Sequence, residues 1–88
     1  MNKQKIVPNT LREHRNKVGL RQIDVAKKLG FCNTNRISRW EKGLSVPRII
    51  NLFRLSIIYD VLPEELYREL FEKYYTEMQS KKKDLDIL

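Results

Sequence analysis

The chain has 88 residues, 41% of them hydrophobic, so it is one small domain with a limited core and no room for a large enclosed active site. We expect neither a membrane span nor a secretion signal, because no apolar run is long enough for either. Cys32 is the only cysteine and cannot form an internal disulfide, which fits the expected cytoplasmic location.

The formal net charge of +7 is unevenly distributed along the chain. Residues 1–60 contain 13 Lys or Arg and 4 Asp or Glu, whereas residues 61–88 contain 5 and 7. A basic segment of this kind suits a polyanionic partner, because each phosphate that it neutralises releases counterions. Charge alone fits an ordinary soluble basic surface equally well.

The pattern predicts an all-α protein, since no segment alternates apolar and polar residues for long enough to form a sheet. Residues 10–13, Thr-Leu-Arg-Glu, have the pattern of a capping box and predict a first helix from residue 11 to Val18. A second helix is expected over residues 22–29, and Gly30 ends it. The residues of this helix that should face inward are Val25, Ala26 and Leu29.

Three further helices are predicted in the rest of the chain. Asn33 is a good N-cap for a helix over residues 34–42, which ends at Gly43. Pro47 precedes a fourth helix over residues 48–59. The residues expected to be buried on this fourth helix are Ile49, Leu52, Phe53 and Leu55 or Ile58. Residues 63–65, Pro-Glu-Glu, start a fifth helix, whose regular order should end at the lysines 81–83.

The second and third helices form the most specific pattern. Ala26 is small enough for a neighbouring helix to approach, and Gly30 makes the turn between them. The third helix has an apolar side, with Ile37 and Trp40, opposite a polar and cationic side. A helix of this kind suits the major groove of DNA.

Residues 11–66 resemble the helix-turn-helix family of phage repressors and their Xre/Cro-type relatives. The residues that carry the resemblance are Leu11, Arg12, Arg15, Gly19, Leu20, Gln22, Ala26, Leu29, Gly30, Ile37, Ser38, Glu41, Gly43, Pro47 and Leu66. The resemblance implies a compact five-helix repressor-like bundle with an extended last helix. We therefore expect a flexible basic arm over residues 1–8, a DNA-binding domain over 9–70 and a C-terminal extension over 71–88.

The resemblance also implies roles for individual residues in reading double-stranded DNA. The expected base readers are Thr34, Asn35, Arg36, Ser38 and Arg39, of which Arg36 also suits a phosphate. The expected phosphate contacts are Arg21, Gln22, Lys42 and Arg48. Asn pairs with adenine and Arg with guanine through two hydrogen bonds each, whereas Lys supplies a point charge. The alternative for each residue is an ordinary solvated surface position. Arg15 and Glu41 resemble an internal ion pair of the family.

The chain departs from the family pattern at two places. Twelve residues separate Gly30 from Gly43, one more than usual, so the turn is longer or the third helix starts later. Counting back from Ile37 and Glu41 gives the positions of the expected base readers. In addition, Arg21 stands where Ser or Thr normally caps the second helix, and such a loss costs about 0.5–2 kcal/mol.

The fifth helix has an apolar stripe longer than a small bundle can cover, which indicates an interface. The residues expected to make it are Leu70, Phe71, Tyr74, Tyr75 and Met78. We expect a homodimer that binds a palindromic operator through the third helix of each copy. The expected role is transcriptional regulation, as a repressor. Two alternatives are an antitoxin-like module that binds a protein partner through this helix, and an architectural DNA binder aided by Lys3 and Lys5.

An enzyme is not expected. His14 and Cys32 are the only candidates for a nucleophile, a general base or a soft metal ligand, and each stands alone. A structural zinc site needs four ligands, and no glycine-rich phosphate loop is present. We therefore expect neither a metal nor a cofactor.

Overall fold

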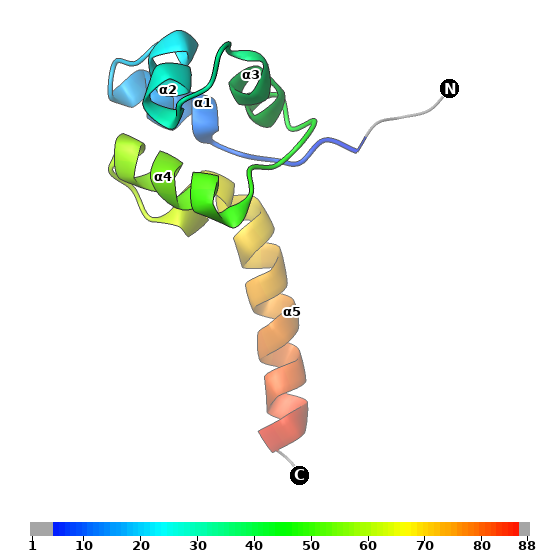
Figure 1. Ribbon diagram of the computed structural model, residues 1–88. Coiled ribbons are helices and arrows are strands. Elements are labelled where there is room, and N and C mark those ends of the chain that lie inside the picture. Colours follow the sequence, from blue (N-terminus) through cyan, green and yellow to red (C-terminus); the bar gives the residue numbers. More distant parts are fainter. Residues whose placement is uncertain (1–4, 87–88) are drawn as a thin grey trace.

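The computed structural model describes residues 5–86, with their side chains as far as residue 83. Its elements are α1 (Leu11–Lys17), α2 (Gln22–Leu29), α3 (Asn35–Glu41), α4 (Ile49–Tyr59), the short 3-10 helix η1 (Pro63–Tyr67) and α5 (Arg68–Asp86). No strand occurs among the described residues, and the predicted all-α fold is confirmed. The helices α1 to α4 gather in one body, from which α5 leaves as a single rod (Figure 1).

The core lies where α1, α2, α3 and α4 meet η1. It consists of Leu11, Val25, Ala26, Leu29, Ile37, Trp40, Leu55, Tyr59 and Leu66. All the residues predicted to face inward from the second and third helices are among them. Ala26 is fully buried, so its single methyl group allows the neighbouring elements to pack closely against α2.

The end of α2 forms as predicted. Gly30 has a φ of +79°, a left-handed conformation that a glycine adopts without steric cost. The amide of Phe31 then donates to the carbonyl of Ala26 at 2.8 Å, which satisfies a carbonyl in the last turn of the helix. This turn directs the chain from α2 towards α3.

The predicted capping box at the start of α1 is wrong. The Thr10 hydroxyl donates to the carbonyl oxygen of Glu65 at 2.7 Å, and the Thr10 amide donates to Leu66 at 3.0 Å. Instead, the side-chain oxygen of Asn9 accepts from the Leu11 amide at 3.1 Å. The Thr10 hydroxyl thus bonds to the carbonyl of Glu65 and not to the amide of Glu13. Thr10 therefore joins α1 to η1 and does not cap its own helix.

The predicted burial of α4 is wrong at two of its residues. Ile49 is 60% exposed and Phe53 is 49% exposed, whereas Leu55 is buried and Leu52 and Ile58 are half-buried. The inward side of the helix is centred on Leu55 and Tyr59, so Ile49 and Phe53 point away from the core. No other element among residues 5–86 buries them, because α5 leaves the body (Figure 1).

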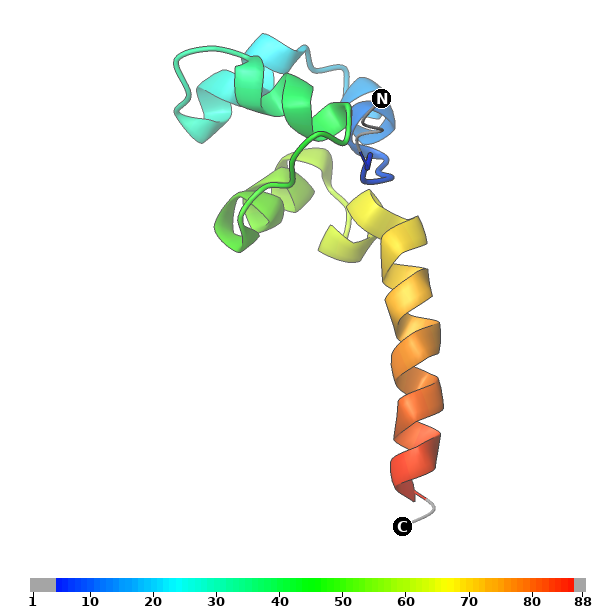
Figure 2. The same cartoon turned by 90° about the vertical axis from the view of Figure 1, so that its right-hand side faces the viewer.

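The last helix also differs from the prediction. It begins with the 3-10 turn η1 and continues as α5 through the three lysines to Asp86. Lysine is a good helix former and favours the negative C-terminal end of a helix, so these residues extend α5 rather than end it. The side view shows how far α5 extends beyond the body (Figure 2), and the molecule measures 52 × 38 × 21 Å.

The start of the described chain lies against the end of α3. The Val7 amide donates to the carbonyl of Gly43 at 2.9 Å, and Val7 and Pro8 are half-buried. A Cβ atom at Gly43 would lie 2.5 Å from both Ile6 Cγ2 and the Val7 oxygen, so this close approach requires a glycine. This part of the expected arm is therefore packed, while residues 1–4, including Lys3, lie outside the described residues.

Candidate nucleic-acid interface

The turn between α2 and α3 accommodates the additional residue. α3 begins at Asn35, one residue later than predicted, with Thr34 at the N-cap position and no cap from its hydroxyl. The side-chain oxygen of Asn33 accepts from the Asn35 amide at 3.0 Å, so Asn33 still satisfies a free amide at this end. Ile37 and Trp40 are buried, which places the opposite side of α3 in solvent.

An ion pair behind α3 fixes this helix to α1. Arg15 Nε lies 2.6 Å from Glu41 Oε2, and Arg15 Nη2 lies 3.0 Å from Oε1. A third donor, Nη1, bonds to the carbonyl of Leu20 at 2.9 Å. The Arg15 side chain is 11% exposed and that of Glu41 only 5%. The hydrogen bonds that Arg15 donates to Glu41 raise the pKa of Arg15, so its guanidinium remains charged at neutral pH.

Gln22 belongs to the same network. Its Nε2 donates to Glu41 Oε1 at 3.0 Å, so the first residue of α2 is bonded to the last residue of α3. The carboxamide has a second N–H, and the amides of Gln22 and Ile23 have no partner within the helix, whereas that of Asp24 donates to the Arg21 carbonyl at 3.1 Å. The end of α2 can therefore hold a phosphate while Gln22 stays bonded to Glu41.

Arg21 is exposed and bonded to its neighbour Asp24. Its guanidinium donates to both Asp24 oxygens, at 3.1 and 3.0 Å, and its backbone amide donates to Asp24 Oδ2 at 2.8 Å. These bonds lower the pKa of Asp24 to about 2. Asp24 thus supplies the cap that Arg21 cannot, and a phosphate that binds Arg21 must compete with this carboxylate.

The outward side of α3 carries Asn35 and Arg39, and Lys42 directly follows the helix; all three are exposed and polar. Their spacing of four and three residues places them on one face of the helix. Thr34 and Ser38 lie at its margin and are half-buried. The face is short, polar and cationic, and it projects from a helix whose back is fixed by the core and by the ion pair.

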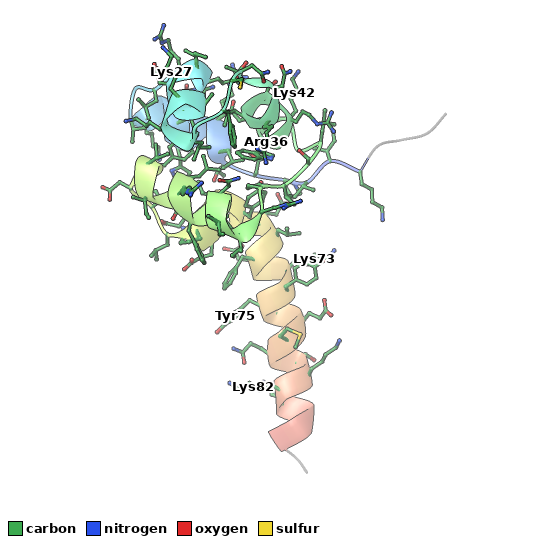
Figure 3. All side chains as sticks on the ribbon, in the orientation of Figure 1. Lys27, Arg36, Lys42, Lys73, Tyr75 and Lys82 are labelled. Carbon is green, nitrogen blue, oxygen red and sulfur yellow. The ribbon has the colours of Figure 1, made fainter. Side chains whose placement is uncertain are left out.

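Arg36 lies beside this face rather than on it. Its guanidinium carbon is 4.2 Å from the centre of the Phe31 ring and 5.8 Å from that of Trp40. The two rings pack edge to face with their centres 5.8 Å apart. Figure 3 shows Arg36 nearer the middle of the body than Lys42. The stacked position favours a phosphate at the wall of the groove over a base edge for Arg36.

The loop between α3 and α4 completes the surface. Lys42 and Arg48 are exposed at its two ends, while Gly43 and Pro47 between them are buried. Asn9 holds the end of α3, since its side-chain amide donates to the carbonyls of Val7, Trp40 and Glu41 at 3.1–3.3 Å. This role of Asn9 could not be predicted from the sequence, because an asparagine before a helix has the same pattern as a local cap.

Other kinds of site find little support in the described part of the chain. No group of three His, Cys, Asp or Glu residues there could hold a metal ion. His14 is half-buried on α1, and Cys32 is exposed in the turn before α3. None of the described helices is long and apolar enough to cross a membrane.

These features define a helix-turn-helix domain, in which a small-residue packing side on α2, a glycine turn and a polar outer side on α3 occur together. The model of the family described as "Helix-turn-helix" matches residues 11–66, more than half of the chain. The chain belongs to this family, which comprises the Xre/Cro-type, phage repressor-like proteins. No curated protein and no solved structure matches the chain. Family membership makes it a DNA-binding protein of the transcription-regulator class.

Proposed function

We propose that the protein is a transcriptional repressor that recognises a specific operator by placing α3 in the major groove. The observation that carries this proposal is the exposed face of Asn35, Arg39 and Lys42 on a helix held from behind by the Arg15–Glu41 ion pair. A rigid helix positions hydrogen-bonding groups against base edges at little cost in conformational entropy. Occupying the operator is then sufficient for repression, and no catalytic step is needed.

The exposed residues divide into base readers and phosphate anchors. Asn35 and Arg39, with Thr34 and Ser38 at the margin, face outward for base readout. The anchors surround them: Arg21 and Gln22 at the start of α2, Arg36 beside the face, and Lys42 and Arg48 at the loop. Phosphate contacts set the register and orientation of the domain, while base contacts set its sequence preference.

A homodimer completes the proposal. The residues Leu70, Phe71, Tyr74, Tyr75 and Met78 provide the apolar side of α5, and all but the half-buried Leu70 are exposed. A twofold axis through two copies presents two α3 helices to one palindromic operator, with half-sites about 34 Å apart. Such a protein acts at the DNA of a prokaryotic or phage-infected cell, in the cytoplasm.

Selection from a random pool of double-stranded DNA tests this function. We expect enrichment of a palindrome, whose half-site and spacing the same experiment gives. No enriched motif would contradict specific readout and favour an architectural binder. Sedimentation tests the dimer separately, both without DNA and with it. A protein that stays monomeric at high micromolar concentration in both conditions would exclude the dimer.

A second candidate is an antitoxin-like module that binds another protein through α5 and represses its own gene. The exposed aromatic side chains of Phe71, Tyr74 and Tyr75 favour it, because aromatic residues are enriched at protein interfaces. Stoichiometric co-purification with one heterologous protein from the native host would support this candidate. A self-contained dimer that binds the same operator alone would support the repressor.

A further inference from the structure

The outer side of α4 is an apolar surface that the chain leaves uncovered. Ile49, Ile50, Phe53 and Ile57 are each about half exposed or more, and no acidic residue lies between positions 44 and 59. A single exposed Ile or Phe is ordinary on a protein surface. Four on one side of an eleven-residue helix are not, because that side would expose a continuous apolar area to water.

This surface continues into a groove between α4 and α5. The groove has a volume of about 490 Å³ and is almost wholly apolar, with Ile49 and Phe53 on one wall and Phe71 and Tyr74 on the other. Phe71 also lines two adjoining hollows along α5, which reach Tyr75 and Met78. The exposed sides of α4 and α5 therefore form one surface rather than two.

The size of this surface fits a protein partner. An aromatic side chain buries about 150–250 Å² in total, so each half-exposed one leaves on the order of 100 Å² to be covered. Eight exposed apolar side chains between Val46 and Met78 line the groove and the two hollows. Together they approach the roughly 800 Å² that each partner contributes to a stable interface. A small molecule in the groove would leave Ile57, Tyr75 and Met78 uncovered.

We propose that α5 of a second copy lies in the α4–α5 groove, with its Phe71–Met78 stripe against Ile49 and Phe53. The first copy's α5 lies in the groove of the second copy in the same way, so the two copies exchange their α5 helices. This inference rests on the proposed dimer and adds α4 to its interface. The exposed stripes have similar lengths, about 12 Å from Ile49 to Ile57 and about 11 Å from Phe71 to Met78, at 1.5 Å per residue. Two such pairs around a twofold axis form a four-helix contact, the geometry in which amphipathic helices bury one side each.

Charge favours a second copy over a partner of unknown composition. Residues 44–59 contain two arginines and no acid, whereas residues 61–80 contain five glutamates and only two basic residues. When α5 of one copy lies along α4 of the other, the exposed Arg54 comes near an acidic helix.

Two substitutions on different helices test the exchange in the full chain. Phe53→Glu places a charge on the α4 wall, and Met78→Glu places one on the far part of α5, outside the groove of its own copy. Each should raise the dimer dissociation constant at least about tenfold, as expected when an interface centre is disrupted. Thr76→Glu is the matched control, because it adds the same charge on the opposite side of α5 and should leave the constant unchanged.

The dissociation constants are measured by sedimentation without DNA, with circular dichroism melting to show that each variant folds. If Phe53→Glu does not fold, Phe53→Ala replaces it, with a smaller change in the same direction. Loss of dimer in Met78→Glu but not in the α4 variant would mean that α5 pairs with α5 alone. That result overturns the exchange and leaves the proposed dimer intact. A wild-type monomer that binds an operator half-site, or whose groove binds an apolar dye, also overturns it.

Discussion

The outer side of α3 is polar, and the charged and aromatic groups behind it are bonded or packed within the chain: Arg15 to Glu41, Gln22 to Glu41, and Phe31 to Trp40. The outer sides of α4 and α5 are apolar, and no residue in the described part of the chain covers them. The first surface is held together within one copy, whereas the second is, in our proposal, half of an interface. Substitutions on the two surfaces should therefore separate DNA recognition from association, and those behind α3 should affect stability first.

The largest effect is expected from Glu41→Ala. This change leaves the Arg15 guanidinium buried without its carboxylate, and breaking a buried ion pair in this way costs about 3–5 kcal/mol. Thermal and urea denaturation should show the loss. The control is Glu77→Ala, which removes an exposed pair with Lys81 at 3.3 Å and should change stability by less than about 1 kcal/mol. Equal effects of the two substitutions would show that the pair behind α3 has no special role.

Arg39→Ala should come next, with an effect on DNA alone. Loss of a two-bond contact to a guanine should cost about 1–3 kcal/mol and relax the preference at one base pair. Competition binding with operators changed at single positions measures this. The oligomeric state should stay as in the wild type, since Arg39 lies on the polar surface. A uniform loss across all operators would place Arg39 among the phosphate anchors instead.

Lys42→Ala should reduce DNA affinity by less than Arg39→Ala, and without changing the sequence preference. Lys42 is exposed at the end of α3, so its removal should weaken binding to every sequence alike. The slope of log affinity against log salt concentration should fall in magnitude by about 0.9, the contribution of one phosphate contact. Titrations at several salt concentrations measure the slope. An unchanged slope would remove Lys42 from the interface.

The smallest effect concerns Asp24. Arg21 holds the pKa of this carboxyl at about 2, below its ordinary value of 3.8. Because the folded-state pKa is lowered, the stabilisation is present above about pH 3.8 and is lost as the pH falls through about 2. Carboxyl chemical shifts should give a midpoint near 2 in the free protein. In Arg21→Ala the midpoint should return towards the ordinary value, and an unchanged midpoint would contradict the contact.

The polar surface could be predicted from the sequence because its signals are local or lie in fixed spacings. Gly30 ends α2, Ile37 and Trp40 define the back of α3, and their positions give its outward residues even with a longer turn. The position of Arg36 does not follow from helical spacing, because its guanidinium stacks on Phe31, which lies in the longer turn.

The apolar surface could not be predicted in the same way. Helical spacing shows which side of a helix is apolar, but it does not show which body covers that side. Helical spacing therefore predicts Ile49 and Phe53 in the core of their own chain, where the structure instead exposes them. Likewise, Thr10 and Asn9 have the pattern of local caps, and only the fold brings the carbonyls of Glu65 and Trp40 within their reach.

The bond between Val7 and Gly43 makes the end of α3 depend on a residue that precedes α1. It links two residues that have thirty-five residues between them. A cut after Val7 would remove this bond without breaking α3, and amide hydrogen exchange in the last turn of α3 should then become faster. Proteolysis before the first helix would in this way loosen a helix that it leaves whole.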